Sequence, residues 1–450
     1  MADGSRPKTN LVLIVADDLG YGDLGCYGQK RFSTPHLDRM AREGMRFTQH
    51  YSGCTVCAPS RSALMTGQHT GHTYIRGNKE KNPEGQEPLP ENTVTLPGLL
   101  RKAGYRTGAF GKWGLGPPGS GGDPNRQGFD EFFGYNCQRL AHNYYPWHLW
   151  HNQEKVVLEE NREDRRGVYA PDLIHRKALA FLQENATRPF FLFLPVIVPH
   201  AELFAPETYL ARFRGKYNPE KSFRGTDSGP AFKTGGYGSQ PEAHAAFAAM
   251  VAWLDEKVGE ILVRLKELGL EENTLVLFSS DNGPHLEGGA DPDYFDSNGP
   301  LRGYKRDLYE GGIRVPMLAR WPGRIRPGSV SEHACAFWDW LPTICEAAGA
   351  AIPRDIDGIS FLPELQGRKQ RAHPYLYWEF HEGPSSQQAV TMGRWKGVRK
   401  SSRQPLELYD LDADIGETTD IAGRHAGVVE TMQRLMKEAR TESALWPFKP

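Results

Sequence analysis

Short, continuous apolar runs recur along the chain at residues 11–16, 189–196 and 274–278. A run of this length and character is typical of a β-strand that is covered on both faces. Each run ends in a polar or charged group, Asp-Asp after the first, Pro-His after the second and Asp-Asn after the third. The pattern therefore predicts buried strands whose carboxyl ends carry the chemistry.

Other segments repeat apolar residues at the spacing of a helix, with proline near the start or glycine at the end. We expect helices at residues 34–44, 95–104, 171–184, 242–268 and 339–348. Beyond residue 350 the pattern changes to short, partly alternating segments, which predict strands. These lie at residues 375–380, 389–392, 395–399 and 407–409, before a helix at 427–438.

Composition excludes several classes of protein. The 450 residues are 39% hydrophobic and 24% charged, with a formal net charge of −1, which is typical of a globular protein with a large core. This balance shows no excess of charge that would indicate binding to nucleic acid or to a membrane surface, so we expect neither as a partner. The longest apolar run is far shorter than a membrane span. Nothing in the sequence indicates an oligomeric state.

The opening of the chain contains no apolar segment of the kind found in a signal peptide. We expect an exported protein, periplasmic or extracellular, whose leader has been removed. The six cysteines are too few for a disulfide scaffold. Cys54 and Cys57 form a C-x-x-C pair, which leaves a redox or zinc half-site open as an alternative.

Carboxylates follow two of the predicted buried strands. Asp17 and Asp18 come after the first run, and Asp281 and Asn282 come after the third. Because ligands gather at the carboxyl ends of parallel strands, these side chains can converge. Three carboxylates and one amide suit calcium or magnesium better than zinc. The alternative is a solvated turn at each strand end.

Residues 54–67 place a nucleophile at the start of a short helix. Pro59 suits the first helical turn, which puts Cys57 at the N-terminus, where free N–H groups favour an anion. Arg61 lies four residues on and projects from the same face. The segment therefore predicts a site for a tetrahedral oxyanion.

The run Cys57-x-Pro-Ser-Arg61, followed by Thr66-Gly67, resembles the signature of the type I, formylglycine-dependent sulfatases of the alkaline phosphatase superfamily. The resemblance implies that a formylglycine-generating enzyme, a transient partner, oxidises Cys57 to an aldehyde that is hydrated to a diol. One diol oxygen would attack sulfur, and the other would allow sulfate to leave by C–O cleavage, an exit that a serine lacks. It also implies a Ca²⁺ cofactor whose ligands are Asp17, Asp18, residue 57, Asp281 and Asn282.

Two further blocks, residues 104–116 and 301–316, resemble the same family. By this resemblance Lys112 and Lys305 contact the sulfate, and His200 protonates the leaving alcohol. Where the family has a histidine two residues after the first of these lysines, this chain has Gly114. We expect another base to replace it, with His142 as the candidate.

We therefore predict an α/β protein with a large mixed sheet sandwiched by helices in a catalytic domain at residues 1–350. A smaller C-terminal α+β domain, with an antiparallel sheet and a closing helix, is expected at residues 351–450. The predicted reaction is hydrolysis of a sulfate monoester by a sulfuric ester hydrolase, on a sulfated carbohydrate or an aryl sulfate. The expected catalytic residues are Cys57, Arg61, Lys112, His200, Asp281 and Lys305.

Aromatic residues interleaved with polar ones at 138–148 suit a sugar-binding rim and hence glycan degradation, although ordinary packing is equally compatible. The expected substrate contacts are His72, Arg76, Arg139, His142, His285 and His381. Two alternatives stay open: a phosphomonoester or phosphonate hydrolase of the same superfamily, and a non-catalytic sulfoglycan-binding protein.

Overall fold

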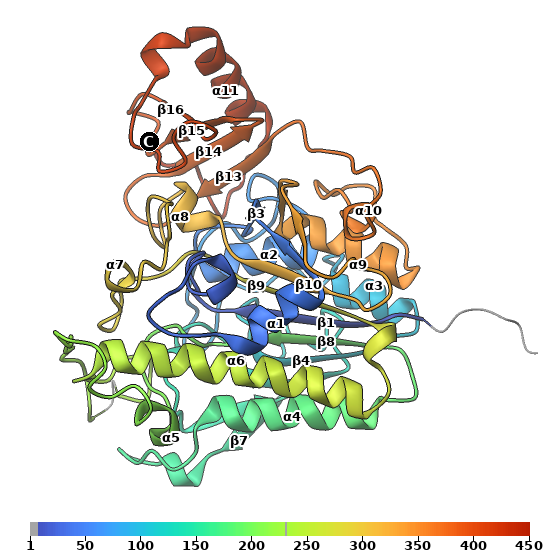
Figure 1. Cartoon of the computed structure of the whole chain (residues 1–450), viewed down its shortest axis with the longest axis vertical. Coiled ribbons are helices and arrows are strands. Elements are labelled where there is room, and N and C mark those ends of the chain that lie inside the picture. The colour runs from blue at the N-terminus through green and yellow to red at the C-terminus, as the bar shows by residue number, and fades with distance from the viewer. Residues whose placement is uncertain (1–7, 230–231) are drawn as a thin grey trace, which may run out of the picture.

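The computed structural model describes residues 8–229 and 232–450, and a sheet of ten strands runs through its centre (Figure 1). In spatial order the strands are β11 (Ser329–Ser331), β2 (Met45–Phe47), β10 (Met317–Arg320), β9 (Thr274–Ser280), β1 (Asn10–Ala16), β8 (Phe190–Pro195), β4 (Arg106–Lys112), β5 (Glu131–Tyr135), β6 (His148–His151) and β7 (Glu154–Val157). The neighbours β9, β1, β8 and β4 are parallel, whereas β10 is antiparallel to β9 and β6 to β5. The sheet is therefore mixed, as predicted.

The continuous apolar runs are explained by burial on both faces of this sheet. All seven residues of β1 are buried. Successive side chains of a strand point to opposite faces, so Val12 and Ile14 enter one hydrophobic core and Leu13 and Val15 enter the other.

Helices cover both faces, as Figure 1 shows. The core that contains Val12 is closed by α1 (Pro35–Glu43), α4 (Ala170–Glu184) and α6 (Ala243–Glu267). The core that contains Leu13 is closed by α2 (Cys57–Thr66), α3 (Leu96–Lys102) and α9 (Trp340–Ala348). The short helices are α5 (Glu207–Leu210), α7 (Pro292–Phe295), α8 (Glu310–Ile313) and α10 (Leu362–Leu365).

A separate four-stranded antiparallel sheet follows near the end of the chain, in red at the top of Figure 1. It consists of β13 (Leu376–Phe380), β14 (Gln387–Met392), β15 (Trp395–Arg399) and β16 (Glu407–Asp410), with α11 (Ala426–Glu438) packed against it. Beneath it, β12 (Cys335–Ala336) pairs with β3 (His50–Tyr51). Leu362 and Leu365 still belong to the core of the large sheet. The predicted fold class is confirmed, and the domain boundary at residue 350 stays a prediction.

The hairpin β6–β7 was not predicted from the sequence. Both strands lie at the edge of the sheet, and β7 is mostly exposed, so its side chains do not alternate between apolar and polar. Residues 1–7, which include the opening used for the signal-peptide prediction, lie outside the described residues. Within the described residues, no helix has both the length and the apolar character that crossing a membrane requires.

Candidate active site

The carboxyl ends of four adjacent parallel strands meet at one edge of the large sheet. Asp17 and Asp18 follow β1, and Asp281 and Asn282 follow β9. The pairing of Ala16 with Ser280 sets the two strand ends side by side, and the Asp281 amide donates to the Ala16 carbonyl at 3.0 Å. Strand order and register therefore bring carboxylates 264 residues apart in the chain into one group.

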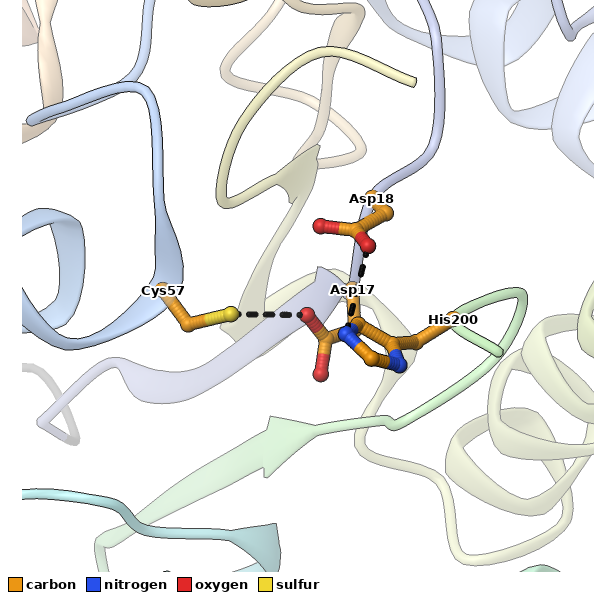
Figure 2. A group of neighbouring side chains, drawn as sticks. All are labelled: Asp17, Asp18, Cys57 and His200. Carbon is orange, nitrogen blue, oxygen red and sulfur yellow. Dashed lines mark hydrogen bonds and ion pairs between the residues drawn. The ribbon is translucent and has the colours of Figure 1, made fainter. Parts of the chain in front are cut away.

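Cys57 enters this group from the opposite side, as the first residue of α2. Its thiol lies 3.3 Å from Asp17 Oδ1 (Figure 2). Lys112 Nζ, at the end of β4, lies 3.1 Å from the same sulfur. One helical turn along, the Arg61 guanidinium donates to Asp281 Oδ2 at 2.8 Å. The predicted convergence of a helix start, a lysine and two strand ends is observed.

Lys305 and His200 close the other side of the group. Lys305 Nζ lies 2.8 Å from Asp18 Oδ2 and 3.0 Å from His200 Nε2. His200 follows β8, and its Nδ1 faces the carbonyl of Ala201, so Nδ1 carries the hydrogen and Nε2 accepts from the lysine. All of these side chains are buried.

Burial and neighbouring charges give the acidic side chains of this group different pKa values. Burial alone would raise the pKa of Asp17 and of Asp18, but Lys112 beside the first and Lys305 beside the second hold both well below the usual range. Burial and the charge of Asp17 instead raise the pKa of Asp281 to about 7, close to the value that suits a general base near neutral pH.

The cysteine and the histidine are neutral in this setting. Burial, reinforced by Asp17, raises the pKa of the Cys57 thiol far above its usual range, so the unmodified side chain is not a thiolate nucleophile. Burial and Lys305 lower the pKa of His200 to about 4. The sulfur of Cys54, the other member of the C-x-x-C pair, lies 3.7 Å from the Glu379 carbonyl. All six cysteines lie in the described part of the chain, and all are free thiols.

The group fits a hard divalent cation. Asp17, Asp18, Cys57 and His200 each offer a ligand atom within 4.8 Å of the others. The Asn282 amide nitrogen donates to Asp18, whereas its buried Oδ1 has no hydrogen-bond partner among the described residues. Such an orphaned oxygen is costly unless something binds it. An oxygen-rich donor set with one unused buried acceptor is suited to calcium or magnesium.

Comparison with known families settles the class of protein. The sulfatase family model matches residues 9–350, and a second model, described as N-sulphoglucosamine sulphohydrolase, C-terminal, matches residues 303–442. The chain belongs to the sulfatase family. It is a sulfuric ester hydrolase.

Relatives and solved structures agree with this assignment. The sulfatase is 34% identical to N-acetylgalactosamine-6-sulfatase of Canis lupus familiaris over 420 residues, 88% of this chain and 72% of that protein. It is 32% identical to human (Homo sapiens) arylsulfatase A over 487 residues, 96% of this chain and 87% of the other. The crystal structure of Ps i-CgsB in complex with k-i-k-neocarrahexaose matches with a TM-score of 0.81 and 29% identity, covering 98% of this chain and 95% of that one.

The Gln138 side chain lies beside Gly114 of the sulfatase, where the family has a histidine. The φ of this glycine is +73°, and a Cβ built on it would lie 2.2 Å from Nε2 of Gln138. The Gln138 side chain therefore fills this space, and its Oε1 is buried without a partner among the described residues. His142, the candidate replacement, stacks on His200 with ring centroids 5.0 Å apart, and burial lowers its pKa to about 3.

Three expected substrate contacts have other partners. Arg76 donates to Glu379 Oε1 at 2.7 Å, and His381 Nε2 lies 2.8 Å from the same oxygen. His72 Nδ1 lies 2.9 Å from Asp357. Strong ion pairs and hydrogen bonds within the protein account for the positions of these three side chains.

Apart from His142, two further expected contacts, His285 and Arg139, also have partners within the protein. His285 stacks on His200 at 5.5 Å, but its two nitrogens face backbone groups of Pro199 and Glu287. Arg139 is exposed and donates to the carbonyl of Thr234 at 2.6 Å. A direct role of either in substrate binding stays a prediction.

Sequence reasoning missed Glu287, which lies at the mouth of the site. Its Oε2 is 3.3 Å from Lys305 Nζ and 3.2 Å from the hydroxyl of Tyr237, and its Oε1 is 2.6 Å from Arg306. Glu287 follows Asn282 by only five residues, but no motif marks it. Gln138 was missed as well, since only packing reveals what fills the space beside Gly114.

Proposed function

We propose that this sulfatase depends on Ca²⁺ and on formylglycine formed from Cys57, and that it removes sulfate from a sulfated sugar. The single observation that carries the cofactor proposal is the contact of Cys57 with Asp17 and Lys112, beside the orphaned Asn282 oxygen. The sugar is supported by the names of the relatives, which include an N-acetylgalactosamine-6-sulfatase and a protein crystallised with a neocarrahexaose.

Asp17, Asp18, Asp281 and Asn282 would hold the ion together with residue 57. Calcium at this place would supply Lewis acidity to an oxygen of the sulfate. Formylglycine at position 57, made by a formylglycine-generating enzyme, would supply a hydrated aldehyde, one oxygen of which attacks sulfur while the other lets sulfate leave by C–O cleavage. A thiol with a strongly raised pKa is poor for either task.

Cationic side chains would bind and orient the sulfate. Lys112 and Lys305 approach from the two sides of the carboxylate group, and each donates within 2.8 Å to one aspartate. Both would offset negative charge on the sulfuryl oxygens as the ester bond stretches. Arg61, fixed by Asp281, would hold residue 57 in position.

Two groups would move protons. Asp281 would accept the proton of the attacking hydroxyl. His200 would donate a proton from Nε2 to the leaving alcohol oxygen, and a bound sulfate ester favours its charged form because it adds a negative charge nearby. Lys305, 3.0 Å from that nitrogen, orients the ring.

The expected catalytic residues run from Cys57 to Lys305, which supports residues 1–350 as the catalytic domain and 351–450 as a smaller C-terminal domain. Export to the periplasm or the cell exterior would match a polymeric sulfated substrate. Secretion of the natural full-length product, followed by cell fractionation, tests that location.

The direct test is substitution of Cys57 with Ser and with Ala. Either change should lower the rate of multiple turnover of 4-nitrophenyl sulfate at least about 1000-fold, because the aldehyde cannot form. Mass spectrometry of the tryptic peptide that contains residue 57 should show the aldehyde in wild type alone. Calcium chelation should lower activity, and added Ca²⁺ should restore it.

The control is 4-nitrophenyl phosphate, the matched phosphomonoester. A Cys57→Ser protein that hydrolyses the sulfate at the wild-type rate contradicts the formylglycine proposal. Preference for the phosphate ester would favour the phosphomonoester hydrolase alternative.

A further inference from the structure

A second pocket, of about 180 Å³, is lined by groups that the reaction above does not use. Its walls are the loop at residues 80–85, the segment around Cys137 and Leu140, Trp147 with His148, and Lys233 with Thr234. Three of its lining side chains are cationic: Lys81, Arg139 and Lys233.

A thin partition of residues 137–142 separates this pocket from the sulfate site. Cys137 and Arg139 line the pocket, whereas Gln138 between them packs against Gly114, two residues after Lys112. At the end of the same segment His142 stacks on His200. The same short segment therefore contributes residues to the pocket and to the surroundings of the sulfate site.

Lys233 is a buried cation without an ionic partner. Its side chain is among the buried groups, and Nζ donates to two carbonyl oxygens, those of Tyr145 at 2.8 Å and Arg165 at 2.9 Å. Among the described residues no carboxylate forms a direct ion pair with it, although the nearby charge of Glu202 favours its charged form and raises its pKa against the effect of burial. A buried ammonium is costly unless an anion accompanies it, and a third N–H remains for a ligand. Burial also lowers the pKa of Lys233 to about 8.

The mouth of the pocket combines charge with an exposed ring. Trp147 is 42% exposed, which is unusual for so large an apolar side chain and suits stacking on a sugar face. Arg139 donates to the carbonyl of Thr234 at 2.6 Å, and its contact with Glu80 at 3.6 Å is an exposed ion pair of little strength. The other pocket carboxylate, Glu84, is already used by His148 and Trp150.

We propose that this pocket binds a sulfate or carboxylate group on the sugar next to the one that carries the reactive sulfate. The substrate class is then an oligosaccharide with at least two anionic groups, not a monosulfated monosaccharide. Lys233 binds the anion within the pocket, Arg139 at its mouth, and the Trp147 ring contacts the sugar that bears it. This inference rests on the proposed sulfated-sugar substrate.

The test compares three substrates of the wild-type protein: a disulfated disaccharide, the same disaccharide with its second sulfate removed, and 4-nitrophenyl sulfate. A fourth, with a uronate as the second sugar, distinguishes carboxylate from sulfate as the bound group. We expect kcat/KM to fall about 10-fold or more when the second anionic group is removed, the value of a hydrogen bond to a charged group.

Variants locate the effect. Lys233→Met keeps the length of the buried side chain and removes its charge. The quantity compared is the ratio of kcat/KM for the disulfated disaccharide to kcat/KM for 4-nitrophenyl sulfate. This ratio should fall by about 10-fold in Lys233→Met. The exposed substitutions Arg139→Gln and Trp147→Ala should lower the same ratio. They test the pocket even if Lys233→Met does not fold. Lys369→Met, an exposed lysine on the loop after α10, is the matched control and should leave the ratio unchanged.

An unchanged ratio in Arg139→Gln and Trp147→Ala, or equal kcat/KM for the mono- and disulfated disaccharides, overturns the pocket proposal. Failure of wild type to hydrolyse any of the sugars while it hydrolyses 4-nitrophenyl sulfate instead overturns the sugar part of the proposed function. Titration calorimetry of the disulfated disaccharide with Cys57→Ala provides a readout that does not require turnover.

Discussion

Two buried charge clusters in this protein look alike in composition but differ in how completely their polar atoms are paired. One surrounds Asp17, Asp18 and Asp281 at the strand ends of the large sheet. The other surrounds Glu379 on β13, where the small sheet meets the rest of the protein. Both combine carboxylates with Arg, Lys or His side chains and have almost no exposure to solvent.

The Glu379 cluster is closed. Oε1 accepts from Arg76 at 2.7 Å and from His381 at 2.8 Å, and Oε2 accepts from Tyr377 and from Arg440, each at 2.8 Å. These partners outweigh the effect of burial and hold the pKa of Glu379 at about 2. Neither carboxylate oxygen of Glu379 is left for a ligand, although Nη2 of Arg440 is buried without a partner among the described residues, so the carboxylate joins parts of the fold.

The strand-end cluster is open. Asn282 Oδ1 has no partner among the described residues, and burial together with the charge of Asp17 raises the pKa of Asp281. A closed cluster stabilises the protein by itself, whereas an open one is completed by something that binds. Between these two clusters, an unpaired acceptor oxygen, and not the presence of buried charge, therefore distinguishes the functional site.

Matched amide substitutions test this distinction, and the largest effect is expected at the open cluster. Asp281→Asn should lower kcat/KM by about 1000-fold, since it removes both a proton acceptor and a metal ligand. Its free energy of unfolding should fall by less than that of Glu379→Gln, because the change relieves repulsion from Asp17 and Arg61 keeps an ion pair with Asp17 at 3.6 Å. Steady-state kinetics and urea unfolding measure the two effects, and a large loss of stability would contradict the open character of the cluster.

Glu379→Gln should show the reverse pattern. Removal of one carboxylate leaves Arg76 and Arg440 buried without their partner, which costs about 3–5 kcal/mol of stability. We expect kcat/KM for 4-nitrophenyl sulfate to stay within about threefold of wild type at a temperature where the variant is folded. Loss of activity in a fully folded variant would place Arg76 or His381 in the substrate site after all.

The same cluster predicts sensitivity to acid. The pKa of Glu379 is lowered from 4.5 to about 2 on folding, so its stabilisation is complete above about pH 5 and is lost as the pH falls toward 2. The loss amounts to about 3 kcal/mol. Urea unfolding at a series of pH values should show it in wild type, and Glu379→Gln should lack this part of the pH dependence.

The smallest effect concerns the edge of the open cluster. Gly114→His should cost about 2 kcal/mol, because a positive φ is strained for histidine and its Cβ overlaps Gln138. The double variant Gly114→His with Gln138→Gly should recover part of this stability. Thermal unfolding measures both, and a single variant as stable as wild type would show that Gln138 does not hold this space.

The central strands and long helices were predictable because their burial requires a regular pattern of apolar residues along the sequence. β1 and β9 are continuous apolar runs, and α6 repeats apolar residues over several turns. The β6–β7 hairpin was not predictable, since edge strands exposed to water need no such pattern. Cys57, Asp17 and Asp281 stood out as candidates because each begins or ends one of the well-marked elements.

The substrate-contact candidates were less well determined by the sequence. Arg76 and His381 look like anion-binding side chains until Glu379 is seen between them, and nothing in the order of residues reveals that contact. Glu287, Gln138 and the Lys233 pocket were missed for the same reason.

Local sequence by itself determined the family motif, the strands that end in carboxylates, and the helix that begins at Cys57, because hydrophobic burial and helix geometry act over neighbouring residues. Only the tertiary structure decided which charges meet, which polar atoms stay unpaired and where a cation lacks its anion. Pairing between side chains hundreds of residues apart depends on strand order and register, and these arise only when the whole chain has packed.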